Sequence, residues 1–512
     1  MDDKLRIYTT ISEGIDTPLI SCEIAVLPDT GFKLSFLGVG RDIAKNFRKK
    51  IESILLSNNI ECNEGKYILN LLPADTLKND SSIDLPMALL ILKSNNLLSQ
   101  EVIDFMEDTI FIGELSLDGQ VFPVRNALSA ALNLKKMGKK RIVIPKGNEK
   151  ECSLIADGNI YSIDYLTDIL DLSNLKIIKR TKPIITNDRG SLNFNQVVGQ
   201  KEAKRALEIA AAGRHNILLY GSPGSGKTML AQRVPSIMSS LIDEEIIETT
   251  RIYSSGSLLE DGNPIVSIPF RRPHHSVSAK GMIGGGYPIY PGEVSLSHNG
   301  ILFMDEFLEF RKECSEALRE CMEEKIVHLK RGRDSVAYPA SFMLIAALNP
   351  CPCGFFGEEN KRCVCSWNKI KYYLGKLSGP LLDRIDLQVH LKIVDIKDIH
   401  ANQTKESSSE LLSENIKDCI KIQFSRNGKR IYNGIIPPEN IDTICNISST
   451  ASDYLKDIFD SLNMSMRSYH KIIKVSRTIA DLNDENYIEI EHIKEALSYR
   501  SFDNFLRKFD VS

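Results

Sequence analysis

Short apolar runs separated by polar turns predict mixed strands and helices in the first third of the chain. Among them are CEIAVLP, RKKIESILL, PMALLIL and KRIVIP. A polar, proline-containing stretch over 179–195 then predicts a linker. Further along, strands alternate with helices and glycine-rich turns, a pattern that favours an α/β domain with a parallel sheet over 196–395.

The C-terminal part of the chain predicts helices, because apolar positions recur at spacings of three and four in TASDYLKDIFDSL and YHKIIKVSRTIADL. A polar stretch over 397–415 marks the junction that precedes them. We therefore expect a multidomain α/β protein, with an N-terminal α/β domain over 1–178, the linker, the core, and a helical domain over 396–512.

Length and composition narrow the functional classes. A chain of 512 residues argues for more than one domain, since single hydrophobic cores rarely exceed about 300 residues. Lys and Arg total 64 against 67 Asp and Glu, and this net charge of -3 excludes a globally basic nucleic-acid binder but not a local basic patch. No apolar run is long enough to span a membrane, and the N-terminus lacks a signal-peptide pattern. The odd number of 11 cysteines favours a reducing compartment, so we expect a cytoplasmic protein.

The strongest motif is a glycine-rich loop, or P-loop, between a predicted strand and a predicted helix. An apolar run over 215–220 leads into GSPGSGKT, which fits G-x-x-x-x-G-K-[ST], and a helix-compatible segment over 229–239 follows. In such a loop backbone N–H groups wrap phosphates, the lysine reaches the β- and γ-phosphates, and the threonine hydroxyl binds Mg²⁺. The strand–loop–helix setting disfavours the alternative of a chance match in a turn. The predicted ATP-binding residues are Gly221, Ser222, Pro223, Gly224, Ser225, Gly226, Lys227, Thr228 and Asp305.

Two carboxylates and an amide follow the next predicted strands. The run GILFMDE ends in Asp305 and Glu306. We expect Asp305 to complete the Mg²⁺ shell with Thr228 and Glu306 to polarise the attacking water, because phosphoryl transfer depends on positioning and charge neutralisation. A strand predicted over 342–348 ends at Asn349, whose amide would orient that water. The alternatives are a solvated acidic turn and a turn-forming asparagine.

Two arginines are candidates for stabilising the γ-phosphate. Arg384 follows a short helical segment in SGPLLDR, and Arg467 opens the helix predicted in SMRSYHKII. Arginine supplied across a subunit boundary is a known way to stabilise phosphate charge. Either residue would otherwise form a surface salt bridge, and the pattern alone leaves both interpretations open.

Four cysteines in one short segment, Cys351, Cys353, Cys363 and Cys365, form the pattern C-x-C-x₉-C-x-C. Four thiolates satisfy the tetrahedral coordination of a closed structural Zn²⁺ site, so a catalytic zinc is not expected. The alternative is four free thiols or a redox pair. Because the segment directly follows Asn349, a metal would brace that turn.

The segment KIVHLKRGRDSVAYP over 325–339 predicts a β-hairpin with Lys330, Arg331 and Arg333 at or near its tip. A basic tip favours contacts with phosphate backbones, so these residues are candidate DNA contacts, and a solvated hairpin end is the alternative. The segment over 271–297 is too long and glycine-rich for a minimal connection. Its two adjacent histidines are predicted to position the loop rather than to bind metal.

The order of several segments resembles the magnesium-chelatase-like AAA+ ATPases, and within them the ComM/YifB family of bacterial proteins. These segments are VGQ before the P-loop, then RPHH, GGG, PGEVSLSH and LLDR. The resemblance implies a P-loop AAA+ α/β core, a C-terminal α-helical lid and a homo-oligomeric ring, commonly a hexamer, with ATP between subunits. It implies that Asn349 is the sensor-1 residue, Arg384 the finger contributed in trans, and Arg467 the sensor-2 arginine of the same chain. The segment over 271–297 resembles an inserted loop that projects towards the ring pore.

The N-terminal domain resembles the proteolytic domain of Lon, which has a ribosomal-protein-S5-like α/β fold. GELSLDG, PV and RIVIPKGNE carry this resemblance. Lon uses a Ser–Lys dyad, but Met87 stands at the position of the serine and Leu128 at that of the lysine. Neither side chain can act as nucleophile or base, so we expect a scaffold without peptidase activity.

These observations lead to the hypothesis of an ATP-hydrolysing ring motor that acts on DNA. For ComM-like proteins the resemblance implies branch migration or helicase-type remodelling in homologous recombination or natural transformation, with recombination proteins as further partners. The alternatives are a magnesium-chelatase-type ATPase that remodels a partner protein, and a binding module in which the N-terminal domain recruits partners.

Overall fold

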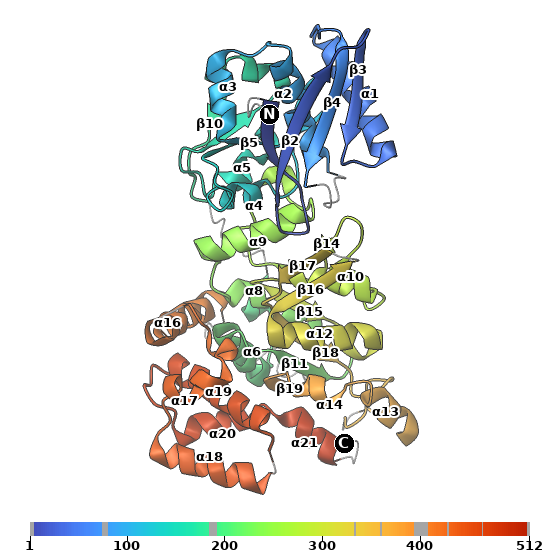
Figure 1. The fold of residues 1–512 in the computed structure, drawn as a ribbon. Helices are drawn as coiled ribbons and strands as arrows, with labels where there is room; N and C mark the ends of the chain where they lie inside the picture. The colour runs from blue at the N-terminus through green and yellow to red at the C-terminus, as the bar shows by residue number, and fades with distance from the viewer. Residues whose placement is uncertain are drawn as a thin grey trace.

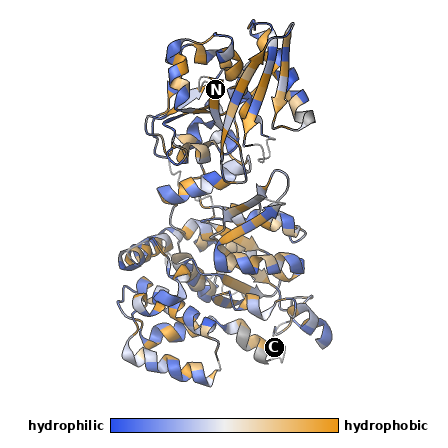
Figure 2. Ribbon diagram, viewed as in Figure 1, coloured by the Kyte–Doolittle hydropathy of each residue, from blue (hydrophilic) through white to orange (hydrophobic). Residues whose placement is uncertain are grey.

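The computed structural model describes residues 5–73, 80–183, 192–331, 334–358, 361–393, 408–427, 430–462 and 464–508. An N-terminal α/β part, a central α/β part and C-terminal helices follow one another along an elongated molecule (Figure 1). Apolar residues concentrate along the strands of both sheets, and hydrophilic residues cover outward-facing helix surfaces (Figure 2). The prediction of a multidomain α/β protein is confirmed.

The N-terminal part is built on a mixed 8-stranded sheet in the order β10-β9-β8-β5-β1-β2-β4-β3. The apolar helix α2 packs on β1 and β2 and is buried along almost its whole length. The strands of the sheet are β1 Arg6–Thr10, β2 Leu19–Leu27, β3 Phe32–Leu37, β4 Gly65–Leu72, β5 Thr109–Phe111, β8 Arg141–Pro145, β9 Ile160–Ile163 and β10 Lys176–Ile177. A separate antiparallel pair is formed by β6 Glu114–Leu115 and β7 Val121–Phe122. The helices are α1 Arg41–Ser57, α2 Asp84–Ser94, α3 Gln100–Glu107, α4 Ala127–Leu132 and α5 Glu149–Cys152.

The two positions where the Lon dyad would stand lie inside this part. Met87 is on α2 and Leu128 is on α4, and both side chains are completely buried. Met87 belongs to the cluster around α2 and Leu128 to a second cluster beneath α4. Both residues therefore act as packing groups of the hydrophobic core.

A 5-stranded sheet forms the centre of the protein, in the order β12-β15-β18-β11-β19. All neighbouring strands run parallel, as the sequence predicts. Strands β11, β15 and β18 are buried throughout, which is typical of parallel strands covered on both faces. The bounds are β11 Ile217–Gly221, β12 Phe270–Arg271, β15 Ile301–Met304, β18 Met343–Leu348 and β19 Leu387–Leu391.

Helices and two short hairpins surround the central sheet. They are α6 Lys201–Gly213, α7 Lys227–Ala231, α8 Val234–Ile237, α9 Asp243–Ser255, α10 Ala279–Ile283, α11 Glu293–Leu296, α12 Lys312–Glu324, α13 Trp367–Leu374, α14 Gly379–Leu382, and the hairpins β13 Gly284–Gly285 with β14 Tyr290–Pro291 and β16 Ile326–Arg331 with β17 Asp334–Pro339. The hairpin predicted over 325–339 is thus present. The single helix expected over 229–239 is instead two short helices, because Pro235 lacks an N–H and its ring clashes with a carbonyl one turn earlier.

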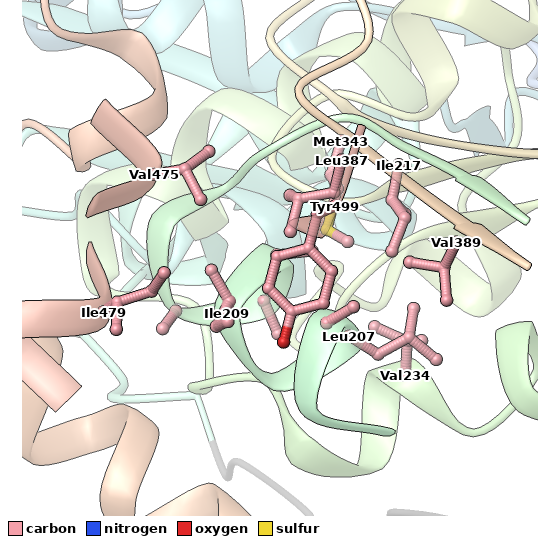
Figure 3. Packing of buried hydrophobic residues seen from close by; sticks show 14 of the residues in the cluster. Leu207, Ile209, Ile217, Val234, Met343, Leu387, Val389, Val475, Ile479 and Tyr499 are labelled. Atoms are coloured by element: carbon pink, nitrogen blue, oxygen red, sulfur yellow. The ribbon is translucent and has the colours of Figure 1, made fainter. Parts of the chain in front are cut away.

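The C-terminal helices, except the last, share one hydrophobic core with the central sheet. Leu207 of α6 and Val475 of α19 lie around Ile217 and Leu387 of the sheet (Figure 3). The helices are α16 Ser409–Asn427, α17 Ile441–Ile444, α18 Ser449–Ser461, α19 Met466–Leu482, α20 Ile490–Ser498 and α21 Ser501–Lys508. The prediction of a helical C-terminal region is confirmed.

Two stretches that the sequence marks as polar connections contribute to this core. Helix α16 begins at Ser409, so the end of the junction predicted over 397–415 is helical, with Leu412 buried and the charged residues outside. Phe194, at the end of the predicted linker, is completely buried. Its backbone N–H donates to Oγ of Ser409 at 2.9 Å, which ties the two stretches together.

Among the described residues, no helix combines the length and the apolar character that a membrane-spanning segment requires.

Candidate nucleotide-binding site

Three of the predicted site segments meet at one edge of the central sheet. The P-loop follows β11, Asp305 follows β15, and Asn349 follows β18. Tyr220 of β11 is level with Leu348 of β18, and Met304 of β15 is level with Ala346. Because these strands are parallel, their carboxyl ends bring the P-loop, the carboxylates and the amide together, at the edge where open α/β sheets bind ligands.

The P-loop glycines occupy backbone positions that favour glycine. Gly221, Gly224 and Gly226 have φ values of 155°, 81° and 94°. A Cβ at Gly221 would lie 2.3 Å from the carbonyl oxygen of Leu391 on β19, so the first glycine lets the strand ends approach closely.

Lys227 is folded onto the loop that it is expected to serve. Its Nζ donates to the carbonyl oxygens of Gly221 at 2.7 Å and Ser222 at 2.9 Å. Burial lowers the pKa of Lys227 to about 8, although the charges of Asp305 and Glu358 act to raise it. A cation with little compensating charge thus lies beneath the loop, where an anionic phosphate would stabilise it.

The Thr228 hydroxyl and the Asp305 carboxylate fit a Mg²⁺ site. Oγ1 of Thr228 lies 2.9 Å from Oδ2 of Asp305. Adjacent ligands of an octahedral Mg²⁺ at about 2.1 Å would be separated by about 3.0 Å. Arg272, which sequence reasoning did not assign to the site, places Nη2 2.7 Å from the same Oδ2 and neutralises the carboxylate. Arg272 is the first residue of the RPHH segment, so that motif could have indicated it.

Glu306 is accessible to water. Its side chain is 57% exposed, and its backbone adopts the left-handed conformation with φ 51° and ψ 47°. Nδ1 of His275 lies 3.5 Å from Oε2 of Glu306, so this histidine touches the predicted catalytic carboxylate. Asn349 is partly buried one residue beyond β18. Glu306 and Asn349 follow the neighbouring strands β15 and β18, so the carboxylate and the amide lie at the same edge of the sheet.

The two candidate arginines meet at one carboxylate elsewhere in the structure. Arg384 forms an ion pair with Oε1 of Glu323, and Nη2 of Arg467 lies 2.9 Å from the same oxygen. The side chain of Arg384 is 6% exposed and that of Arg467 is 56% exposed. Sequence reasoning missed Glu323, which lies on α12 far from both arginines in the chain.

This arginine pair lies at the opposite edge of the sheet from the P-loop. Arg384 precedes β19, whose Leu387 is level with Ile217, whereas Leu391 is level with Gly221 at the start of the P-loop. The four residue steps from Leu387 to Leu391 alone span about 13 Å. Arg384 therefore cannot reach a triphosphate bound at the P-loop of its own chain.

The four predicted cysteines are close together. Sγ of Cys351 lies 3.3 Å from Sγ of Cys353 and 3.7 Å from that of Cys363, and the latter two are 3.6 Å apart. All four sulfur atoms lie within 4.8 Å of one another. A tetrahedral zinc with Zn–S bonds of about 2.3 Å requires S···S separations of about 3.8 Å, so the residues fit a structural zinc.

The electrostatics of the cluster also favour a metal. Burial raises the pKa of the Cys353 thiol, but backbone hydrogen bonds at Phe355 and Val364 and contacts with Cys351 and Cys365 lower it to about 6. Burial raises the pKa of Cys351 to about 12. One thiolate is therefore favoured at neutral pH, and a divalent cation would draw the protons from the others.

The candidate DNA contacts lie at one end of the β16–β17 hairpin. Lys330 is exposed and level with Ser335. In the strand register Arg331 is level with Asp334, but its side chain and the whole of Arg333 lie outside the described residues. Val336 of the same hairpin lies directly against Gly14 and shares a hydrophobic cluster with Ile15, so the hairpin stem touches the N-terminal part.

Family models match three successive parts of the chain. The model described as "Subunit ChlI of Mg-chelatase" matches residues 25–148. The model described as "Magnesium chelatase, subunit ChlI" matches residues 193–399, and the one described as "Magnesium chelatase, subunit ChlI C-terminal" matches residues 406–500.

Whole proteins align with the chain as well. It is 34% identical over 505 residues to the YifB protein of Escherichia coli K12, an alignment that covers 98% of this chain and 97% of that protein. It is 34% identical over 511 residues to competence protein ComM of Haemophilus influenzae, with 98% of each covered. A partial match, 24% identical over 249 residues, is to the Holliday junction branch migration complex subunit RuvB of Mycoplasmopsis pulmonis, covering 47% of this chain and 62% of that protein.

Proposed function

The chain belongs to the ComM/YifB family of magnesium-chelatase-like AAA+ proteins, and we propose that it is an ATP-hydrolysing ring motor that acts on DNA. Its task would be branch migration or helicase-type remodelling in homologous recombination or natural transformation. Similarity over nearly the whole chain to a competence protein carries this proposal. The partial similarity to a branch-migration subunit supports the same substrate.

The geometry of the phosphate edge supports ATP hydrolysis, which membership of an AAA+ family implies together with ATP and Mg²⁺. The P-loop backbone and Lys227 would hold the phosphates, and Thr228 and Asp305 would hold Mg²⁺, which neutralises phosphate charge. Glu306 would polarise the attacking water while Asn349 orients it. The exposed position of Glu306 beyond β15 suits this role.

We assign both Arg384 and Arg467 to the nucleotide of a neighbouring subunit. Their common partner Glu323 and the strand register behind Arg384 support this assignment. The sequence led us to expect that Arg467 acts on the nucleotide of its own chain. We assign it to the neighbouring subunit instead, because it pairs with the same glutamate as Arg384. An arginine acting in trans requires an assembly in which each subunit completes the next, and we propose a homo-oligomeric, hexameric ring.

The outer parts of the chain would support this motor. We propose that residues 1–178 form a Lon-like, S5-like scaffold without peptidase activity, since the buried Met87 and Leu128 can neither attack a carbonyl nor accept its proton. With 179–195 as the linker and 196–395 as the ATPase core, the helices of 396–512 would form the lid. Their shared core with the central sheet would transmit nucleotide-dependent motion.

DNA is expected to raise ATP hydrolysis several-fold, and the stimulation should fall as salt increases because phosphate contacts release counterions. Single-stranded, duplex and four-way-junction DNA should be compared in one ATPase assay. Alanine at Lys330, Arg331 and Arg333 should remove the stimulation and leave basal hydrolysis intact. Alanine at Lys135 and Lys136, two exposed lysines of the N-terminal part, is the matched control.

An ATPase that ignores all three DNA forms at low salt would contradict the DNA-motor proposal. Hydrolysis stimulated instead by a purified partner protein would favour the alternative, a protein-remodelling ATPase of the magnesium-chelatase type. All three matching family models are described as parts of a magnesium chelatase subunit, and this is why a partner protein should be tested in the same assay.

The purified, tag-free protein is expected to contain about one Zn²⁺ per chain, because four sulfur atoms at these separations complete a tetrahedral site. Elemental analysis measures the stoichiometry. Cys353→Ser should lower the zinc content, whereas Cys62→Ser, at a partly exposed cysteine of the N-terminal part, should retain it. Protein without any bound metal after purification in zinc-containing buffer would contradict the assignment.

A further inference from the structure

The cysteine-rich loop, described over 351–358 and 361–365, contacts the P-loop directly through its first part. At Gly354, between two of the cysteines, a Cβ would lie 2.3 Å from Cδ of Pro223 and 2.5 Å from its Cγ. Gly354 also has a φ of 84°, a conformation that favours glycine. The two loops therefore touch at a point where only a glycine leaves room for the P-loop proline.

A second contact joins the same two loops. Glu358 accepts a hydrogen bond from Oγ of Ser222, whose side chain is completely buried. The charge of Glu358 also acts to raise the pKa of Lys227, so the carboxylate is electrostatically close to the phosphate-binding lysine. The cysteine-rich loop thus supports the P-loop at two consecutive residues, Ser222 and Pro223.

An aromatic contact extends this support to the strand that carries the P-loop. The ring of Phe356 lies 5.6 Å from that of Phe505 on α21, in an edge-on arrangement. Phe505 in turn lies 5.8 Å from Tyr220, the residue immediately before Gly221. The cysteine-rich loop, the last helix and the end of β11 therefore pack as one unit.

The loop has little regular structure of its own to maintain these contacts. Within the described residues 351–358 and 361–365 there is neither a helix nor a strand. A loop of this kind holds a single conformation only if cross-links or packing constrain it, and a metal bound by four thiolates would be such a cross-link. Loss of that cross-link would release the support of the P-loop.

We propose that a metal ion bound by the four cysteines fixes the conformation of the P-loop, so that nucleotide affinity depends on metal occupancy. Glu358 is a positioning residue in this arrangement, acting on the nucleotide through Ser222. The inference rests on the proposed nucleotide and zinc sites and adds a regulatory link between them. It does not depend on which polymer the motor acts on.

The test compares nucleotide affinity and zinc content in the same full-length samples. Zinc-loaded and chelator-treated wild-type proteins are titrated with a fluorescent ATP analogue, and far-UV circular dichroism verifies that both remain folded. Metal removal is expected to weaken binding about tenfold, within the range seen when groups that support a site are lost. Adding back Zn²⁺ alone should restore the affinity.

Gly354→Ala separates the contact from the metal, because it leaves all four thiols in place. The variant should keep its zinc yet bind the analogue about tenfold more weakly, since its methyl group displaces Pro223. Gly138→Ala is the matched control, because Gly138 has a similar φ of 66° and nothing within 4 Å of a Cβ. If the Gly354→Ala protein does not fold, the comparison of zinc-loaded and chelator-treated wild-type protein still tests whether nucleotide affinity depends on the metal.

Three substitutions of Glu358 test its positioning role. Glu358→Gln keeps an acceptor for the Ser222 hydroxyl and should bind the analogue nearly as well as the wild type, whereas Glu358→Ala should bind it several-fold more weakly. Glu358→Met keeps a side chain of similar bulk without an oxygen acceptor, so a packing role alone predicts wild-type affinity for it, whereas the hydrogen bond to Ser222 predicts a loss like that of Glu358→Ala. Equal losses in the Glu358→Gln and Glu358→Ala variants would overturn the role assigned to this residue.

The outcomes distinguish this inference from the proposed function. Equal nucleotide affinity with and without zinc overturns the coupling, and so does a chain that binds no metal. If the Gly354→Ala protein binds the analogue as tightly as the Gly138→Ala control, the contact between Gly354 and Pro223 does not influence nucleotide binding. An ATPase that fails to respond to DNA, but whose nucleotide affinity follows its zinc content, would overturn the DNA motor and support the coupling.

Discussion

Replacing Glu306 with glutamine is expected to lower ATP hydrolysis about a thousandfold while ATP binding is retained. The amide has nearly the shape of the carboxylate but cannot polarise the attacking water. In the proposed site the P-loop would supply the phosphate contacts and Asp305 a Mg²⁺ contact, so neither would depend on this side chain. Steady-state ATPase rates and titration with a fluorescent ATP analogue measure the two effects separately.

Glu309→Gln is the control for this result. Glu309 is an exposed glutamate three residues further along, and its carboxylate lies 3.8 Å from Nζ of Lys376 on the surface. The Glu309→Gln protein should hydrolyse ATP at the wild-type rate. A Glu306→Gln protein with normal turnover would contradict the role given to Glu306, and one that no longer binds ATP would indicate a structural role instead.

Replacing Arg384 with alanine is expected to lower hydrolysis by about a thousandfold or more and to leave nucleotide binding intact, as for other arginines that act across a subunit boundary. The decisive measurement mixes Arg384→Ala protein with Lys227→Ala protein, each of them inactive alone. In an equal mixture about a quarter of the interfaces would combine an intact P-loop with an intact arginine. Activity should therefore return on mixing.

Arg319→Ala provides the matched control, since Arg319 is exposed on the same α12 helix and its charge also acts on Glu323. It should hydrolyse ATP normally. Mixtures that stay inactive, although light scattering shows assembled rings, would contradict action in trans. Arg467→Ala tested in the same mixtures would decide whether the second arginine also serves the neighbouring subunit.

Much of the fold follows from local patterns in the sequence. Apolar runs predicted β11, β15 and β18 to within two residues, because a strand buried on both faces has no polar position. The helix-compatible segment over 229–239 is helical only in part, because Pro235 interrupts it and the structure has two short helices there. The junction expected up to residue 415 was also too long, because α16 shows its polar face to solvent and buries Leu412.

The sequence by itself determined which chemical groups the candidate site contains. The P-loop, Asp305 and Asn349 each follow a recognisable strand, and parallel strands necessarily bring their carboxyl ends to one edge of the sheet. The four cysteines are likewise close in the chain, so their proximity in space required only a compact loop.

Only the tertiary structure decided which side chains those groups touch. Arg272 on Asp305, Glu323 between the two arginines, and Glu358 on Ser222 are contacts between elements far apart in the chain. Periodicity and motif spacing describe neighbours along one element, whereas such contacts depend on how separate elements pack. The pairing of β19 with β11 likewise placed Arg384 at the edge of the sheet opposite to its own P-loop. The register of that pairing, which composition does not reveal, sets the level at which β19 begins.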